Sequence, residues 1–358
     1  MPKDIFKANA PSNNELHVRT AWVDAVKLFA CLLVVFGHLY MSMTSSGLLD
    51  GNSPCYQLPI QTIYSFHVPL FFVCSGFLYQ VDKAGATPKS HIRSIKRKAL
   101  ALGVPYVAFS SLTLLLKNLF SSEVNNQATP FVHTLLFEPI APYWYLYTLF
   151  LLFCLIPRMG NAREIIGLFV ATLVIKLIYV SFPLCWGLPD LVQKVASCAI
   201  WFAFGMLLSN RAFRHKALDN KAALAALIFA ITFSFLVYRK ANSNRVFQLI
   251  LAMLFVYSII SFAVNTEGFK LPKPLLSHLS QYFMPVYVLH TICAAGIRSV
   301  LLRLGIDSLS VNIIIGLAAS IAAPMAIYRF SLSHPWALFF FEPAKAMKME
   351  KDINEQTN

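Results

Sequence analysis

The chain has 358 residues and a formal net charge of +14, and 57% of its residues are hydrophobic while only 13% are charged. With a mean hydropathy of +0.61, this composition excludes a soluble domain with a polar shell and indicates a polytopic membrane protein. The length accommodates roughly ten spans of ~20 residues with short connections. We therefore expect an all-α transmembrane bundle with no separate soluble domain.

Residues 1–20 are polar and lack the apolar region of a signal peptide, so we expect a cytoplasmic amino-terminal segment. A membrane domain is predicted over 21–330, followed by a cytoplasmic tail over 331–358. The tail is expected to contain an interfacial segment and then disorder. The apolar stretches predict spans at 21–43, 59–80, 99–120, 143–157, 165–182, 193–209, 222–238, 246–264, 279–300 and 310–329.

The basic residues are distributed unevenly over the two sides that these spans define. Of the 30 Lys and Arg residues, 21 fall on the side that holds both termini and only six on the opposite side. The positive-inside rule therefore places both termini in the cytoplasm. The positive charge reflects membrane topology, and we expect no nucleic-acid partner.

The first span contains His38 in an otherwise apolar stretch. A membrane segment keeps a titratable group at a cost, usually where the group faces a cavity, a partner or a substrate. Asp24 and Lys27 open the same span and lie roughly 17–21 Å from His38 along the helix axis. Their predicted role is an ion pair with each other or a contact to a substrate at the cytoplasmic end.

Two further histidines lie inside predicted spans. His67 lies ~12 Å below the outer start of the second span, at a depth similar to that of His38. His290 in the ninth span lies nearer the midplane. The alternative for each is an ordinary hydrogen bond to a neighbouring helix.

Two connections between spans and the start of the fourth span also carry candidate binding residues. The cytoplasmic loop 81–98 carries six cations, which would either attract an anionic cofactor or only satisfy the positive-inside rule and touch anionic lipid. The connection 121–142 is the longest outward one and is expected to shape an entrance. Trp144, Tyr145 and Tyr147 at the outer end of the fourth span predict an interfacial aromatic belt or a stacking surface for a sugar ring.

The seven cysteines are scattered and show no spacing that would suit zinc or a redox pair, so we expect no metal site. We interpret them as packing residues. A disulfide between Cys55 and Cys185, in two outward loops, is the alternative.

Four short sequence motifs, which occur in order along about 270 residues, resemble those of a known family. The segment from Trp22 to His38 and the segment from Phe66 to Phe77 resemble the first two helices of the integral-membrane acyltransferase-3 family. Two later motifs of that family resemble the segments Pro142 to Leu146 and Tyr282 to His290. Three positions depart from the family pattern: Lys27 replaces an Arg, the loop motif is Arg93-Ser-Ile-Lys96, and the serine expected ahead of Tyr287 is displaced.

The resemblance implies transfer of an acyl group, most often acetyl from acetyl-CoA, to a hydroxyl of a carbohydrate. It implies a bacterial cytoplasmic (inner) membrane enzyme with acyl-CoA as co-substrate, no permanently bound cofactor, and an envelope glycan or lipid-linked sugar as acceptor. Oligomeric state is not specified.

The site residues follow from combining the residues with the resemblance. We predict His38 as the general base toward the acceptor hydroxyl, with His67 as a second catalytic residue. The predicted substrate-binding residues are Asp24, Lys27, Arg93, Lys96 and Arg97 toward the donor, and Ser75, Trp144, Tyr147, Tyr287 and His290. Ser75 could carry the acyl group, but the Ser75-Gly76 pair more often permits close helix packing, so we favour direct transfer.

A proton-coupled secondary transporter is the main alternative, with His38, Asp24 and Lys176 as a proton path. Against it, no inverted repeat and no matching pair of broken spans is detectable. A structural membrane protein is a second alternative, but it would not need intramembrane histidines at matched depth.

Overall fold

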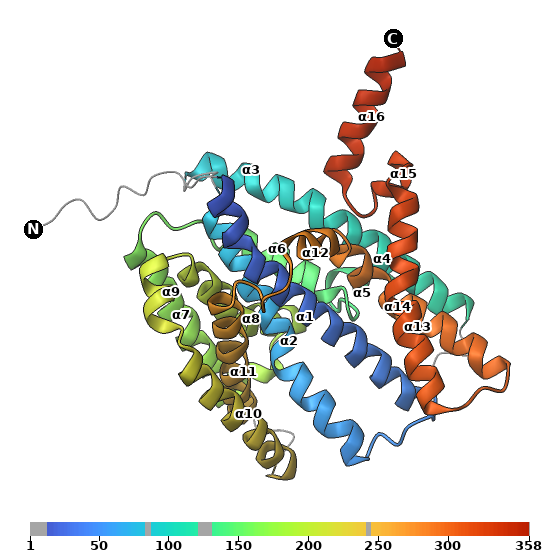
Figure 1. The fold of residues 1–358 in the computed structure, drawn as a ribbon, viewed down its shortest axis with the longest axis horizontal. Helices are drawn as coiled ribbons and strands as arrows, with labels where there is room; N and C mark the ends of the chain where they lie inside the picture. Colours follow the sequence, from blue (N-terminus) through green and yellow to red (C-terminus); the bar gives the residue numbers. More distant parts are fainter. Residues whose placement is uncertain (1–12, 83–86, 121–130, 241–244, 358) are drawn as a thin grey trace, which may run out of the picture.

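The computed structural model describes residues 13–82, 87–120, 131–240 and 245–357 (Figure 1). Every regular element within these ranges is helical, and eight helices are long and apolar enough to cross a membrane. The bent pair α9 and α10 would make a ninth span, and the 12-residue helix α6 is a shorter apolar helix. The predicted all-α polytopic bundle is confirmed, while ten crossings and cytoplasmic termini remain predictions.

The long apolar helices are α1 (Asn13–Ser45), α2 (Pro54–Val81), α3 (Pro88–Lys98) with η1 (Ala99–Gly103) and α4 (Val104–Leu119), α7 (Ala162–Ser181), α8 (Asp190–Leu208), α11 (Arg245–Asn265), α13 (Phe283–Arg303) and α14 (Leu309–Ser331). The other helices are α5 (Phe131–Leu136), α6 (Trp144–Leu155), η3 (Pro183–Gly187), α9 (Arg211–Ala217), α10 (Asn220–Lys240), α12 (Lys273–Ser280), α15 (Pro335–Leu338) and α16 (Pro343–Thr357).

Helices α1 and α2 lie in the middle of the bundle (Figure 1). Helices α13 and α14 flank them on one side, and α7, α8, α10 and α11 lie on the other. The two central helices therefore reach both groups, so a side chain on α1 or α2 can face residues that are far apart in the sequence.

Two glycines allow the closest approach between helices. A Cβ added to Gly76 of α2 would lie 2.0 Å from the carbonyl oxygen of Phe202 on α8. A Cβ added to Gly205 of α8 would lie 2.0 Å from the carbonyl oxygen of Val73 on α2. Only glycine fits at these crossings, as small residues do where membrane helices pack backbone to backbone.

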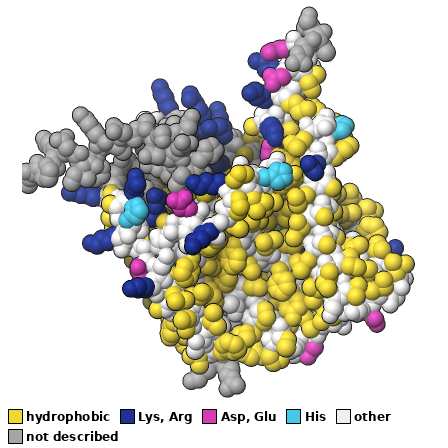
Figure 2. All heavy atoms as spheres, viewed as in Figure 1, with side chains coloured by type: hydrophobic (Ala, Val, Ile, Leu, Met, Phe, Trp, Pro, Cys, Tyr) yellow, Lys and Arg dark blue, Asp and Glu magenta, His cyan; other side chains and the backbone are white. Residues whose placement is uncertain are grey.

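Lys and Arg side chains gather at one end of the molecule, which we call the basic end (Figure 2). Helix α1 begins there, and α3 and α16 lie there (Figure 1). The opposite end, where α1 ends and α2 begins, is called the distal end. The positive-inside rule would place the basic end in the cytoplasm.

Two sequence-based expectations are wrong. The segment 81–98 is a helix from Pro88 onward, because Thr87 and Ser90 form a reciprocal capping box at its start. The tail is not disordered after Ser331 but continues into α15 and α16. Phe341 and Ala346 are buried against the bundle and hold this segment in place.

Two expected segments lie partly outside the described residues, and an alternative disulfide is not formed. The predicted amino-terminal segment lies outside the described residues up to residue 12, and so does the stretch 121–130 of the long connection. Cys55 and Cys185 are both free thiols, so the alternative disulfide is absent.

Candidate active site

A cavity of about 520 Å³ lies among α1, α2, α6, α7, α8, α11 and α13. Its position is toward the distal end, because Trp144 and Arg245 begin their helices there and Lys176 lies near the end of α7. The volume is within the range of small-molecule sites. The His, Lys, Arg, Tyr and Trp side chains that line it are His38, His67, Lys176, Arg245, Tyr64, Tyr145, Tyr179, Tyr287, Trp144 and Trp201.

Two histidines have their tautomer fixed by backbone carbonyls. The Nδ1 of His67 lies 2.7 Å from the carbonyl oxygen of Ile63, and that of His290 lies 2.8 Å from the carbonyl oxygen of Tyr287. A carbonyl only accepts hydrogen bonds, so Nδ1–H is the donor in each case. In the neutral ring, Nε2 of His67 and of His290 therefore keeps its lone pair. The Nε2 of His290 is buried and has no hydrogen-bond partner.

His38 lies beside the ring of His290, and the ring of Tyr64 lies near those of both His38 and His67. The His38 ring centroid is 5.3 Å from that of His290 and 6.0 Å from that of Tyr64. The Tyr64 ring is in turn 4.7 Å from that of His67. Among the described residues, the His38 side chain forms no hydrogen bond, so its nitrogens remain available for a substrate or for His290.

The aromatic side of the cavity contains some of the predicted residues and omits others. Trp144 and Tyr287 line it, and the Tyr287 hydroxyl donates to the carbonyl of Pro142. Ser75 lies behind Tyr145, where the two hydroxyl groups share a hydrogen bond of 3.1 Å. Tyr147 is not among the lining residues and stacks on Tyr106, with ring centroids 5.2 Å apart.

Two cations in the cavity were not predicted as substrate-binding residues. Lys176 is buried, and its Nζ donates to the Ser197 hydroxyl at 2.6 Å. The guanidinium of Arg245 lies over the rings of Tyr179 and Trp186, at 5.0 and 4.3 Å from their centroids, and donates to the Tyr179 hydroxyl. The sequence signal for Arg245 was a charge that flanks the span 246–264, whereas Lys176 lies within the span 165–182 and was considered only for the proton path of a transporter.

A second cavity of about 350 Å³ adjoins the first and shares Tyr64, Ser65 and Gln248 with it. Gln57 and Gln61 also line it. Both amide atoms of Gln61 and the hydroxyl of Tyr64 are buried without a hydrogen-bond partner in the structure. An amide presents both donors and an acceptor, so Gln61 can bind a ligand that carries hydroxyl groups.

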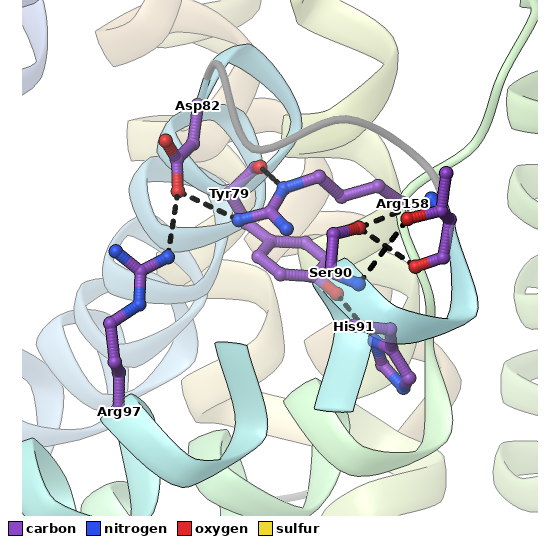
Figure 3. A network of polar contacts seen from close by, with 7 residues as sticks. Tyr79, Asp82, Ser90, His91, Arg97 and Arg158 are labelled. Atoms are coloured by element: carbon purple, nitrogen blue, oxygen red, sulfur yellow. Dashed lines mark hydrogen bonds and ion pairs between the residues drawn. The ribbon is translucent and has the colours of Figure 1, made fainter. Parts of the chain in front are cut away.

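The basic end contains a different kind of polar cluster (Figure 3). Arg158, which is buried, donates to the Asp82 carboxylate at 2.7 Å and to the Tyr79 carbonyl at 2.8 Å. Its guanidinium also lies 4.4 Å from the centroid of the Tyr79 ring. The Tyr79 hydroxyl pairs with His91 of α3 at 3.1 Å, and Arg97 lies 3.7 Å from Asp82. These contacts tie α3 to the end of α2 and to the segment after α6.

Comparison with known proteins identifies the family. The sequence model of the family described as "Acyltransferase domain" matches residues 20–329, nearly the whole chain. This chain belongs to the integral-membrane acyltransferase-3 family. The resemblance drawn from the four sequence motifs is thereby confirmed. Nodulation protein NolL of Mesorhizobium japonicum is 28% identical over 134 residues, which cover 37% of this chain and 34% of that protein's length. No solved structure matches.

In this acyltransferase-family chain, the predicted donor residues do not line the cavity. Arg93, Lys96 and Arg97 are exposed on α3 at the basic end. Asp24 and Lys27 are half-buried on α1 and do not form an ion pair with each other. Since α1 is one continuous helix, they remain roughly 17–21 Å from His38 along its axis.

Proposed function

We propose that this protein transfers an acyl group, most simply acetyl, from cytoplasmic acyl-CoA to a hydroxyl of a bacterial envelope carbohydrate. One observation carries the proposal: His38 and His67, from two helices, line one cavity that continues into an amide-lined space. Family membership supplies the reaction class, and the site supplies a base and a place for a sugar.

The mechanism begins with the acceptor hydroxyl, which is a poor nucleophile until a base removes its proton. A neutral imidazole of His38 accepts this proton as the oxygen attacks the thioester carbonyl. The new C–O bond forms, the C–S bond breaks, and the proton passes from His38 to the departing CoA thiolate. Charges and atoms balance without an acyl-enzyme. This agrees with the position of Ser75, whose hydroxyl is hydrogen-bonded to that of Tyr145 and does not line the cavity.

The neighbouring histidines have separate roles in this proposal. The free Nε2 of His290 is an acceptor for the N–H of His38, which would fix the tautomer of the base. The centroid separation of 5.3 Å leaves this bond to tighten when substrate is bound, as catalytic hydrogen bonds commonly do. Because Nδ1–H of His67 donates to the Ile63 carbonyl, its Nε2 is free to contact the acceptor or to share the proton.

The donor is proposed to approach from the basic end. CoA carries phosphate groups, and Arg93, Lys96 and Arg97 offer exposed cations on one helix. Lys98 is the last residue of this helix, and Lys27 of α1 lies near enough to act on its charge. The acyl chain end would then extend along α1 toward His38 while the CoA head remains at the cytoplasmic face.

The transporter alternative is less well supported. His38 and Lys176 line the same cavity, but Asp24, the third member of the suggested proton path, does not. The family match also gives an acyltransferase and not a carrier.

The decisive experiment compares envelope glycans from cells with and without the protein by mass spectrometry. We expect each acetyl group that the protein adds to contribute about 42 mass units, which disappear in the deletion strain. Purified protein in lipid nanodiscs should also move label from [acetyl-¹⁴C]acetyl-CoA to a glycan fraction. Unchanged glycans together with no label transfer would contradict the proposal and favour the transporter. A different mass increment would identify another acyl group.

A further inference from the structure

The cavity that holds His38 has an unbalanced charge. Two basic side chains, Lys176 and Arg245, line it, and its lining includes no Asp or Glu. Neither basic group forms an ion pair with an acidic residue of the described chain. Asp190, which follows η3 near this end of the bundle, is occupied by Lys194 four residues later.

The two basic side chains are also incompletely paired. Lys176 Nζ has three donors, and its hydrogen bond within the described residues goes to the neutral Ser197 hydroxyl. The guanidinium of Arg245 lies over the rings of Tyr179 and Trp186 and donates one hydrogen bond to the neutral Tyr179 hydroxyl, and these contacts restrict its orientation. The two cations also lie near enough to repel each other. Lys176 is buried, whereas Arg245 is half-buried. A buried cation without a counter-ion is costly, and in membrane helices such residues mark substrate sites.

From these observations we infer that the acceptor carries an anionic group, and that Lys176 and Arg245 bind this group while His38 acts on a hydroxyl of the same molecule. The inference rests on the proposed function, because it specifies the acceptor class for that site. An anion between the two side chains would supply the missing counter-charge. The rigid Arg245 plane suits the paired oxygens of a carboxylate or phosphate, and Lys176 adds a point charge.

The position of the two cations argues against the donor as their ligand. They face the cavity near the distal end, whereas the exposed cations available to CoA phosphates lie on α3 at the basic end. They also share their cavity with His38 and His67, and Trp144 and Tyr287 border the same space. An anion bound there would therefore orient the acceptor relative to the base.

Two chemical sources provide such a group, and a matched set of probes separates them. A carboxylate would come from an acidic sugar of the glycan, and a phosphate from a phosphorylated or lipid-linked sugar. Glucose, glucuronic acid and glucose 1-phosphate share one ring and differ in charge. Binding of each to the full-length protein in nanodiscs is measured without donor, by the change in fluorescence of the tryptophans, of which Trp144 and Trp201 line the cavity.

We expect at least one anionic probe to bind tenfold or more tightly than glucose. Lys176→Met and Arg245→Met should each reduce this preference to less than threefold, because each removes one charge at similar side-chain length. Lys176→Arg should retain the preference and shows whether the pocket tolerates substitution. Lys117→Met near the end of α4 is the matched control, since Lys117 does not line the cavity. Size-exclusion profiles confirm that each variant is folded.

The probes distinguish the possible results. Stronger binding of glucuronic acid assigns the anion to an acidic sugar, and stronger binding of glucose 1-phosphate assigns it to a phosphorylated or lipid-linked acceptor. If neither anion binds better than glucose, including the case in which nothing binds, the inference is wrong. An equal loss in Lys117→Met would also overturn it, because general surface charge would then explain the preference. Label transfer from acetyl-CoA is scored separately, so a protein that prefers anions but transfers no acetyl contradicts the proposed function instead.

Discussion

Both ends of the bundle contain buried polar groups, but the surroundings of these groups differ between the two ends. At the basic end, Arg158 bonds to Asp82 and Tyr79, and Tyr79 continues to His91 (Figure 3). Toward the distal end, Gln61 and Tyr64 have buried polar atoms without partners, and His38 forms no hydrogen bond among the described residues. Buried polar groups in proteins are normally paired. At the basic end, the contacts of Arg158 join helices, although its Nη1 and the Ser94 hydroxyl are also buried without a partner. The distal end differs because the unpaired atoms of Gln61 and Tyr64 belong to side chains that line a cavity, which indicates a ligand site there.

Figure 2 adds a second contrast between the same two regions. Exposed basic side chains are abundant at the basic end, whereas Lys176 and Arg245 lie inside a cavity. Exposed cations attract an anion from solution and are screened by salt, while enclosed cations also fix its position. This difference agrees with the proposal of a mobile cytoplasmic donor at one end and an oriented acceptor at the other.

The largest expected effect tests the open cavity. His38→Ala should lower kcat for acyl transfer by about 10²–10⁴-fold, because it removes the proposed general base. The rate is measured with [acetyl-¹⁴C]acetyl-CoA in nanodiscs. His215→Ala, at an exposed position on α9, is the matched control and should transfer at the wild-type rate. Near-normal transfer by a folded His38→Ala protein would reassign the base, with His67 as the next residue to test.

The packing between α2 and α8 supports the cavity wall and provides the next largest effect. Gly76→Ala places a Cβ against the backbone of Phe202, so the helices must separate, at a cost of about 2–3 kcal/mol of stability. Thermal unfolding in detergent measures this loss. Gly167→Ala on α7 is the control, because a Cβ there meets no atom within 4 Å and should stabilise the helix by roughly 0.5–1 kcal/mol. Equal melting temperatures for the two variants would show that α2 and α8 are not this closely packed.

These helices also show how far the sequence leads. The apolar stretches predicted the spans, because the thickness of a bilayer sets the length of apolar chain needed to cross it. The depths of His38 and His67 followed from helical rise, and both residues line one cavity. The contact of His38 with His290 did not follow, since rise along a helix gives depth but not which helices are neighbours. That contact depends on the packing of α1 against α13.

Charged residues near span ends were the hardest to interpret. Arg245 fits the topology as an ordinary flanking charge, and Lys176 lies within a span, where it was considered only for a proton path. Only the folded arrangement shows that both face the same cavity as His38 and His67. The opposite error occurred at 81–98, which was predicted as a loop because it connects two apolar spans. The capping pair Thr87 and Ser90 in that segment is a local signal for a helix and would have predicted α3.

A smaller effect is expected from the paired cluster at the basic end. Arg158→Lys keeps the charge but loses the forked contacts to Asp82 and Tyr79, which should cost about 1.5–2 kcal/mol of stability. The KM for the acceptor should not change, because this cluster lies outside the distal cavity. Arg163→Lys, an exposed position nearby, should leave the melting temperature unaltered. A changed acceptor KM with normal stability would mean that the cluster takes part in acceptor binding, against the division drawn between the two ends.

The smallest effect concerns the exposed cations of α3. Arg93→Ala combined with Arg97→Ala should raise the KM for acetyl-CoA about three- to tenfold, since each exposed charge contributes only weakly to binding a phosphate in water. The effect should grow at low ionic strength, where screening is weaker. Lys216→Ala combined with Lys221→Ala removes two exposed charges from α9 and α10 and controls for a general loss of positive charge. If both double variants raise the KM equally, the donor is attracted by overall charge and α3 holds no specific site. If neither does, the cations of α3 serve topology alone, and the donor must bind through residues nearer Lys27 and Lys98.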